Sequence, residues 1–527
     1  MESEFVNMTT SERLVAFLES PESYPHRPAA VRTTQTHISW VFFAPPFVYK
    51  VKKPVNLGFL DFSTLEQRHH FCAREVQLNR RLCPEIYLGV TPIHESERGF
   101  SLTDTNGNIA EYAVKMRELP HGFFVNELLA KDAIGENELN RIIARLRRFY
   151  DAEVPTPEIE AWGRPEKLKL STDENFEQVA PFVGRTISPA AFEAIGAYTN
   201  NFYVTHQRLF EERIREQRIR DCHGDLHLDH VHITAKAVTI FDCIEFNDRF
   251  RFIDIANDLA FLAMDFDFER AHQLGALFLH KAARELSDPG MLQLADFYKC
   301  YRAFVRGKVE SLQATSAEHA KRASRYFHLA LRYATMSSEP MIVVVMGRIA
   351  TGKSTVAQQL ASELDWPVFS SDRTRKTLSG VPLTKRTAPE LRGKVYSKEV
   401  TTLTYARLME EGLGALATHS GVILDATFSS RTKRDLLQSE CRKAGVRLQV
   451  IELVADEAEI RSRLQSREKN ATEISDARLE DLKKLAAAYE PPLELSPNLI
   501  RASASVMVAD TVKTVLLQLA GKRSTPG

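Results

Sequence analysis

A loop that contains two glycines and ends in a lysine and a serine carries the sharpest chemical signal in the chain. Residues 347–354 read Gly-Arg-Ile-Ala-Thr-Gly-Lys-Ser and fit the pattern G-x-x-x-x-G-K-[ST]. Such a loop surrounds phosphates with backbone N–H groups, while its lysine reaches the β- and γ-phosphates and its serine hydroxyl is offered to Mg²⁺. The residues that we expect to bind ATP are Gly347, Arg348, Ile349, Ala350, Thr351, Gly352, Lys353, Ser354 and Thr355.

The flanking residues predict the elements that this loop requires. The β-branched apolar run 341–346 has the length of a buried strand, and residues 354–364 are good helix formers with apolar side chains on one face. Further strand-like runs, separated by helical stretches, predict a parallel sheet with helices on both faces. These runs cover residues 367–371, 422–425, 448–454 and 505–508.

Charged residues follow several of these predicted strands, at the sheet edge where ligands gather. The carboxylate of Asp372 could take a hydroxyl proton, and the guanidinium of Arg375 could hold an anionic neighbour. Asp425 ends a strand-like run, where a carboxylate would orient Mg²⁺. Arg463 and Arg467, one helical turn apart, would bring positive charge to the phosphoryl group from a lid. Each also has a structural interpretation, as a helix cap, a turn residue or a solvated helix face.

From about residue 341 onward the chain resembles the P-loop kinase group that includes polynucleotide kinase, chloramphenicol phosphotransferase and the zeta-toxin relatives. That group carries a D-x-x-R element after the second strand, which activates and positions the acceptor hydroxyl. By this resemblance the element falls on Asp372 and Arg375.

An earlier set of residues has the types that a second phosphoryl-transfer site needs. A His-Gly-Asp motif ends at Asp225, and an apolar run reaches Asp242. One carboxylate in such a site accepts the acceptor proton and a second holds the metal ions, and Asp225 and Asp242 suit these roles. Upstream, Lys50 projects from a strand-like run, and Glu75 in a helical stretch could hold this lysine on the α- and β-phosphates.

Residues 31–309 resemble the aminoglycoside phosphotransferase-like (choline-kinase-like) kinases, in the loop 222–230 and in the segments 241–246 and 252–256. This resemblance implies a bilobal protein-kinase-like fold. Together with the P-loop unit, the whole chain resembles the bacterial bifunctional aminoglycoside phosphotransferase-like and P-loop ATP-binding (AAA family) fusion proteins.

The earlier set departs from that family in two ways. His230 stands where the family has a metal-binding Asn, and imidazole is a poor substitute for oxygen around Mg²⁺. We therefore name Asp242 and His230 as metal ligands, with contact between His230 and phosphate as the alternative. The presumed turn 34–39 has no glycine, so that the phosphates would be covered less closely.

Three other functions remain open at this point. The N-terminal region could be a regulatory or binding pseudokinase fused to an active P-loop kinase or ATPase. The P-loop unit could be an ATPase switch without an acceptor, although Asp372 and Arg375 argue against it. The histidines 223, 227, 230 and 232, with Asp225 and Asp229, could form the metal centre of a hydrolase, although their spacing matches no zinc pattern.

Composition agrees with a multidomain protein of the cytoplasm. The 527 residues exceed one core, and 69 basic residues balance 69 acidic ones, which gives no general attraction to nucleic acid or membranes. The six cysteines lack CxxC spacing, and no apolar run approaches membrane-spanning length. We expect no disulfides, no nucleic-acid partner and no membrane partner.

The sequence predicts an α/β multidomain fold. Its segments are a kinase-like N-lobe (1–119), a C-lobe with the catalytic loop (120–314), a helical linker (315–340) and a P-loop kinase-like domain (341–527). The predicted function is that of a bifunctional phosphotransferase that uses ATP and Mg²⁺ on small-molecule hydroxyl acceptors.

Overall fold

The computed structural model describes residues 9–314, 316–383, 386–468, 475–496, 498–504 and 507–525, without the side chains of 467 and 468. The chain forms two compact units whose segments alternate along the sequence. Unit 1 comprises Met1–Lys167, Phe210–Asp265 and Leu277–Leu292, and unit 2 comprises Leu168–Leu209, Phe266–Ala276 and Gln293–Gly527.

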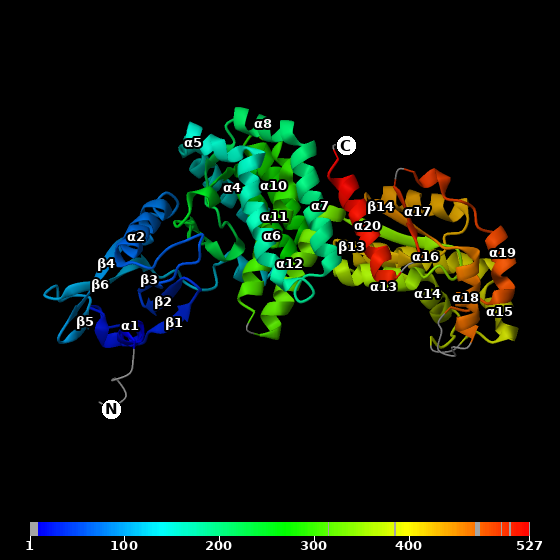
Figure 1. Cartoon of the computed structure of the whole chain (residues 1–527), viewed down its shortest axis with the longest axis horizontal. Coiled ribbons are helices and arrows are strands. Elements are labelled where there is room, and N and C mark those ends of the chain that lie inside the picture. The colour runs from blue at the N-terminus through cyan, green and yellow to red at the C-terminus, as the bar shows by residue number, and fades with distance from the viewer. Residues whose placement is uncertain are drawn as a thin grey trace, which may run out of the picture. The chain divides into compact units, whose positions relative to one another are not determined.

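Unit 1 begins with helix α1 (Thr10–Glu19) and contains an antiparallel six-stranded sheet of order β1-β2-β3-β6-β4-β5. The strands are β1 (Arg32–Gln35), β2 (Ser39–Ala44), β3 (Phe47–Lys52), β4 (Tyr87–Ser96), β5 (Gly99–Ser101) and β6 (Asn108–Arg117). Helix α2 (Leu65–Asn79) packs on β4 and β6 through a buried cluster that includes Cys72, Val76, Tyr87 and Val114. This sheet and α2 appear in blue in Figure 1.

The rest of unit 1 is mainly helical and carries two short strand pairs. Its helices are α3 (Val125–Leu129), α4 (Glu136–Ala152), α5 (Pro157–Glu160), most of α8 (Gln207–Arg215), most of α9 (Ile255–Phe268) and part of α10 (His272–Glu285). Strand β7 (Ile219–Asp221) pairs with β10 (Phe252–Asp254), and β8 (Val231–Ile233) pairs with β9 (Val238–Ile240). The predicted protein-kinase-like fold of this region stays a prediction.

Unit 2 contains the predicted parallel sheet, with strand order β12-β13-β11-β14-β15. The strands are β11 (Met341–Gly347), β12 (Val368–Ser370), β13 (Gly421–Asp425), β14 (Arg447–Val454) and β15 (Leu499–Ser503). Every residue of β11 is buried, as a central parallel strand covered on both faces requires. The parallel sheet is therefore confirmed.

Helices cover both faces of this sheet. One face, with Ile342 and Val344, packs against residues of α16 (Lys398–Ala415) and α17 (Arg431–Lys443). Helix α13 (Lys353–Leu364) contacts β11 and β13 and also α20 (Val508–Arg523), which contacts β15. The other helices of unit 2 are most of α6 (Pro165–Val179), α7 (Pro189–Thr205), most of α11 (Met291–Leu312), α12 (Ala317–Thr335), α14 (Ser371–Leu378), α15 (Pro389–Val395), α18 (Glu457–Glu468) and α19 (Leu482–Ala487).

The predicted strand at 505–508 is wrong. The last strand is β15, which pairs in parallel with β14, and Val508 already begins α20. Residues 505 and 506 lie outside the described residues. The run 505–508 is too short for periodicity to separate a strand from the beginning of a helix. The predicted domain boundaries at 119, 314 and 340 stay predictions.

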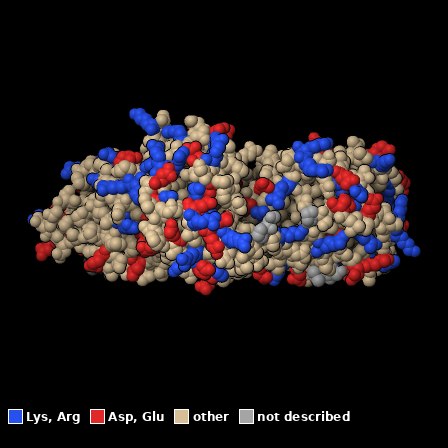
Figure 2. All heavy atoms as spheres, turned by 90° about the horizontal axis from the view of Figure 1, so that it is seen from above, with Lys and Arg blue, Asp and Glu red and all other residues tan. Residues whose placement is uncertain are grey.

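The surface carries charge of both signs. On the face seen in Figure 2, Lys and Arg side chains are interspersed with Asp and Glu. Within the described residues, no helix combines the length and the apolar character needed to cross a membrane. All six cysteines are buried and free.

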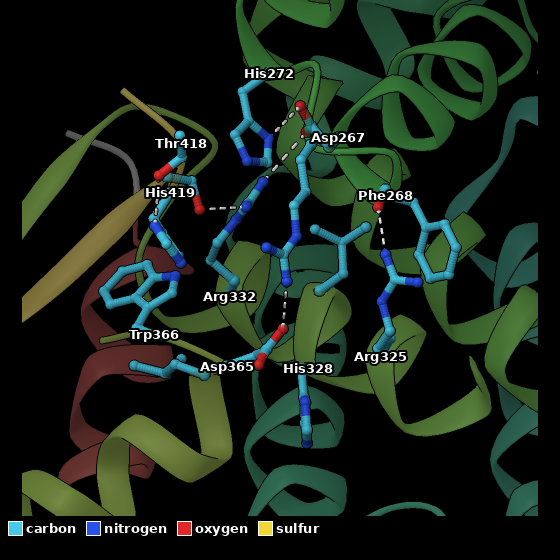
Figure 3. Close-up of a pocket in the computed structure, with 14 residues that line it drawn as sticks. Asp267, Phe268, His272, Arg325, His328, Arg332, Asp365, Trp366, Thr418 and His419 are labelled. Carbon is cyan, nitrogen blue, oxygen red and sulfur yellow. Dashed lines mark hydrogen bonds and ion pairs between the residues drawn. The ribbon is translucent and has the colours of Figure 1, made fainter. Parts of the chain in front are cut away.

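A buried aspartate joins three helical segments of unit 2. Asp267 lies 2.6 Å from Lys299 Nζ and 3.3 Å from Arg332 Nη2, and it accepts a hydrogen bond from Tyr333. His272 Nδ1 lies 3.2 Å from the same carboxylate. Figure 3 shows His272 and Arg332 directed at Asp267 on the wall of a small cavity.

The surroundings of Asp267 change the pKa of two groups. Burial by itself raises the pKa of Asp267, but Lys299 and the hydrogen bond from His272 bring it well below its ordinary value. Burial lowers the pKa of His272, although its hydrogen bond with Asp267 raises it in part. The folded unit thus favours an ionised Asp267 and a neutral His272 at neutral pH.

We expect Asp267→Asn to destabilise unit 2 by about 3–5 kcal/mol, because it leaves Lys299 and Arg332 buried without a negative partner. Urea unfolding followed by the fluorescence of Trp366, in a chain whose other two tryptophans are replaced by Phe, measures this change. Asp365→Asn is the control, since Asp365 is exposed and its ion pair with Arg270 is long, at 3.9 Å. Equal midpoints for the two variants would contradict the assignment.

Acidification should also weaken unit 2. A lowered pKa in the folded state means that the unfolded chain binds more protons, so stability is present above the unfolded pKa and is lost below it. The His272 contribution should decline as the pH falls below 6.5, the ordinary pKa of histidine. The Asp267 contribution should decline only in strong acid, as the pH falls below 3.8. A Trp366 unfolding midpoint that rises on acidification from pH 7 to 5 would refute the His272 part.

Candidate functional site

The phosphate-type loop of unit 2 runs from the end of β11 into α13. Gly347 has φ +146°, and a Cβ built there would lie 2.5 Å from the carbonyl oxygen of Leu453 on the neighbouring strand. Gly352 has φ +85° and precedes the first residue of α13. Both positions need glycine, Gly347 because β14 approaches closely and Gly352 because its backbone is left-handed. The predicted strand, loop and helix are therefore in place.

The lysine and serine of the loop have defined partners. Lys353 Nζ donates to the carbonyl oxygen of Arg348 at 2.8 Å, so the side chain folds back over its own loop. Ser354 Oγ donates to Asp425 Oδ2 at 2.6 Å, which joins the start of α13 to the end of β13. A hydroxyl and a carboxylate are hard oxygen donors of the kind that Mg²⁺ takes, so this pair fits the predicted metal site.

A cavity of about 1340 Å³ extends from the loop across the carboxyl edge of the sheet. This is the edge at which ligands of open parallel sheets bind. The loop and both predicted acceptor residues contribute to one cavity. Charged and hydroxyl groups on its wall include Lys353, Ser354, Asp372, Arg375, Asp425 and Lys433.

Asp372 lies in the first turn of α14, within this cavity. Burial and the charge of Asp425 raise the pKa of Asp372 above its ordinary value, while Lys353 and a hydrogen bond with Ser475 oppose the rise. A carboxyl group with a raised pKa is a better proton acceptor than a fully solvated one, provided that it is ionised at the working pH.

The three predicted arginines of unit 2 have different positions. Arg375 lies in α14 and lines the cavity with Asp372. Arg463 lies in α18, forms an ion pair with Glu459 at 2.8 Å and lines a smaller cavity beside Thr351 and Gly352. The structure does not bring Arg463 into the cavity of Asp372, and its lid role stays a prediction. The side chain of Arg467 lies outside the described residues.

In unit 1 the predicted lysine, glutamate and aspartate meet at one point. Lys50 Nζ lies 2.9 Å from Glu75 Oε1 and 2.6 Å from Asp242 Oδ1. Lys52, two residues along the same strand, lies 2.7 Å from Glu75 Oε2 and contacts Glu245. Strand β3 and helix α2 are thereby joined to the segment after β9.

The pKa values of this cluster reflect the paired charges. Burial by itself raises the pKa of Glu75, but Lys50 and Lys52 bring it below its ordinary value. Burial also raises the pKa of Asp242, yet Lys50 and His230 bring it well below the ordinary range. Against the lowering effect of burial, Asp242 and Glu75 raise the pKa of Lys50 well above its ordinary value. The cluster is ionised at neutral pH.

A second buried carboxylate supports the loop that carries Asp225. Asp258, in α9, accepts hydrogen bonds from the backbone N–H groups of His223 and Gly224 at 3.0 and 2.9 Å and from the Tyr150 hydroxyl at 2.9 Å. Gly224 has φ +85°, and an added Cβ would lie 2.7 Å from the carbonyl oxygen of Phe250. The loop conformation therefore requires glycine at this position and a fixed acceptor beneath it.

His230 lies between Asp225, the predicted base, and Asp242, a predicted metal ligand. Its Nδ1 donates to the carbonyl oxygen of Asp225 at 2.9 Å, and its Nε2 lies 3.5 Å from Asp242 Oδ2. Burial and the charge of His227 lower the pKa of His230 to about 4, so the ring is neutral at physiological pH. Asp225, His227 and His230 also form a group whose ligand atoms lie within 4.8 Å of one another.

Several residues of these sites escaped the sequence predictions. Lys52 could have been assigned as a partner of Glu75, because residues two apart on a strand share a face. Asp258 and Lys433 carried no local signal, because each reaches its site from a helix distant in the sequence. Asp258 lies 33 residues from Asp225, and only folding shows which loop it supports.

Comparisons with known proteins find similarity to the C-terminal region of the chain. Residues 342–492 match a family model described as an AAA domain. Among solved structures, a gluconokinase from Sinorhizobium meliloti shows 20% identity and a TM-score of 0.26, covering 35% of this chain and 94% of its own. Shikimate kinase from Aquifex aeolicus shows 16% identity and a TM-score of 0.25, covering 34% of this chain and 98% of its own.

Matches that cover more of the chain occur among curated mycobacterial proteins. The uncharacterized proteins Rv2004c of Mycobacterium tuberculosis and Mb2027c of Mycobacterium bovis are each 30% identical to this chain over 405 residues. The match covers 76% of this chain and 79% of either relative. The chain therefore belongs to the family of these mycobacterial proteins, and its residues 342–492 match the AAA domain.

Proposed function

We propose that this protein is an ATP-dependent phosphotransferase whose P-loop site transfers a phosphoryl group to a hydroxyl of a small molecule. The observation that carries the proposal is that one cavity contains both the phosphate loop and Asp372. A nucleotide-binding switch needs the loop alone, whereas transfer to a hydroxyl also needs a proton acceptor beside it.

The residues of unit 2 suit a direct transfer. Asp372 takes the proton of the acceptor hydroxyl as the acceptor oxygen bonds to the γ-phosphorus, and the bond from that phosphorus to the β–γ bridging oxygen breaks. ADP leaves with the electron pair of the broken bond. Lys353 and the N–H groups of the loop hold the phosphates throughout. Mg²⁺, held by Ser354 and Asp425, would neutralise charge on the phosphates.

We expect Asp372→Asn to lower phosphoryl transfer by about 10²-fold or more, because an amide cannot accept the proton. ATP affinity should stay within a few-fold, since the phosphate loop is untouched. The measurements are acceptor-dependent ADP release, screened over hydroxylated metabolites, and titration with a fluorescent ATP analogue.

Two further variants make this test specific. Lys353→Ala should abolish nucleotide binding at this site, whereas Asp435→Asn, on the exposed side of α17, should change neither quantity. If Asp372→Asn weakens ATP binding as strongly as Lys353→Ala does, Asp372 holds the structure or the metal and is not the base.

We propose in addition that unit 1 contains a second phosphotransferase site, which would make the protein bifunctional. Support comes from the meeting of Lys50, Glu75 and Asp242, with Asp225 nearby through His230. By the resemblance to aminoglycoside phosphotransferase-like kinases, Lys50 would hold the ATP phosphates, Asp225 would be the base and Asp242 a Mg²⁺ ligand. The ion pairs of Lys50 with Glu75 and Asp242 support this assignment of the lysine and of the metal ligand.

We expect Asp225→Ala and Asp242→Ala each to lower turnover at the unit 1 site by about 10²-fold or more, through loss of the base or of charge neutralisation. His230→Asn should keep or raise activity, because it supplies an oxygen ligand. These variants are made in the full-length chain that also carries Lys353→Ala. Because this substitution inactivates the P-loop site, the remaining ATP binding and turnover come from unit 1. Asp229→Asn, an exposed carboxylate of the same loop, is the control.

The other outcomes assign unit 1 a different function. Retained ATP binding with no effect of either aspartate would make it a regulatory pseudokinase. A requirement for Zn²⁺ without ATP would favour a metallohydrolase centred on Asp225, His227 and His230.

A further inference from the structure

On the acceptor side of the large cavity, two cationic side chains have no carboxylate partner among the described residues. Arg375 and Lys433 both line this cavity, and neither forms an ion pair with any residue that the structure describes. Most other buried cations of the protein are paired, as Lys52 is with Glu75 and Arg213 is with Asp254. Arg375 and Lys433 therefore differ from most buried cations, and they line the cavity that contains the predicted catalytic base, Asp372.

Arg375 is 7% exposed, and its guanidinium is only partly satisfied. Its Nη1 donates to Thr401 Oγ1 at 2.9 Å and to the carbonyl oxygen of Val395 at 3.3 Å, while its Nε has no hydrogen-bond partner. The guanidinium lies over the ring of Tyr396, 4.8 Å from the ring centre. Neutral oxygens and one aromatic face hold the cation in place, and although its charge opposes the rise in the pKa of Asp372, the two groups form no ion pair.

Lys433 approaches from a different helix, α17. Its Nζ lies over the ring of Tyr405, 4.7 Å from the ring centre. Burial, and then the charge of Arg375, lower the pKa of Lys433. Both cations line the same cavity, so that one anion bound there would be attracted by both charges.

We propose that the acceptor of the P-loop site is a hydroxylated small molecule that carries an oxyanion, a carboxylate or a phosphate ester, and that Arg375 and Lys433 bind this group. The inference rests on the proposed function of this site and names its substrate class. Arg375 supplies a planar guanidinium with a free Nε–H, and Lys433 supplies a point charge from α17. Binding the oxyanion there would direct a hydroxyl of the same molecule to Asp372.

The test measures binding and transfer separately. The full-length chain is first saturated with a non-hydrolysable ATP analogue, so that the phosphate loop is occupied. Calorimetric titrations then use three probe sets that share hydroxyl groups: neutral polyols, hydroxy acids with one carboxylate, and phosphate esters of the same polyols. We expect at least one anionic set to bind about tenfold or more tightly than the neutral set, and the set that binds identifies the oxyanion.

The variants assign this binding to the two cations. Lys433→Gln should weaken the anionic probe by about tenfold or more, Lys433→Arg should restore much of the affinity, and the affinity for the ATP analogue should not change. Lys443→Gln, at an exposed lysine of the same helix, is the matched control. Arg375→Gln should also weaken binding of the anionic probe. If this variant does not fold, the Lys433 variants still test the proposal, because Lys433 is only half-buried.

The results separate this inference from the proposed function. Equal binding of neutral and anionic probes, binding of none of them, or unchanged anion binding in Lys433→Gln would overturn the inference. Phosphorylation of a neutral polyol would also overturn it while leaving the phosphotransferase function intact. Anion binding that depends on Lys433 without any phosphorylated product would support the anion site and count against the function.

Discussion

Burying charge is costly, and the way this cost is met shapes both candidate sites. A charged group removed from water needs an opposite charge or several hydrogen bonds in place of its hydration. Glu75 is fully buried, and Lys50 and Lys52 both contact it. Asp267 is buried against Lys299 and Arg332. These pairs join strands and helices that are distant in the sequence, so the compensation of charge also fixes the positions of the elements.

The phosphate loop meets the same requirement with hydrogen bonds inside unit 2. Lys353 donates to a carbonyl oxygen of its own loop, and Ser354 donates to Asp425. Both groups therefore have partners while the loop keeps the conformation that its two glycines permit. A nucleotide phosphate would offer Lys353 an anionic acceptor in place of this neutral carbonyl oxygen.

On the acceptor side of the same cavity, two cationic side chains are not matched by ion-pair partners among the described residues. Arg375 and Lys433 line this cavity from two helices without an ion-pair partner in the part of the chain that the structure describes, and the pKa of Asp372 is raised. Unit 1 differs, because its Lys50, Glu75 and Asp242 neutralise one another. The uncompensated charges of unit 2 indicate where a ligand is expected to supply what the protein lacks, whereas the unit 1 cluster has its charges paired within the chain.

The sequence by itself determined the phosphate loop, the order of strand, loop and helix, and most of the parallel sheet of unit 2. These features rest on local signals, namely glycine spacing, β-branched runs and helical periodicity, which need no partner elsewhere in the chain. It also singled out Lys50, Glu75 and Asp242 by residue type and by order along the chain. Only the tertiary structure decided that Lys52 shares Glu75, that Asp258 supports the loop of Asp225, that Arg463 lies away from Asp372, and that Lys433 and Arg375 line one cavity. Those facts depend on which distant segments approach one another, and the sum of many weak packing contacts determines that approach.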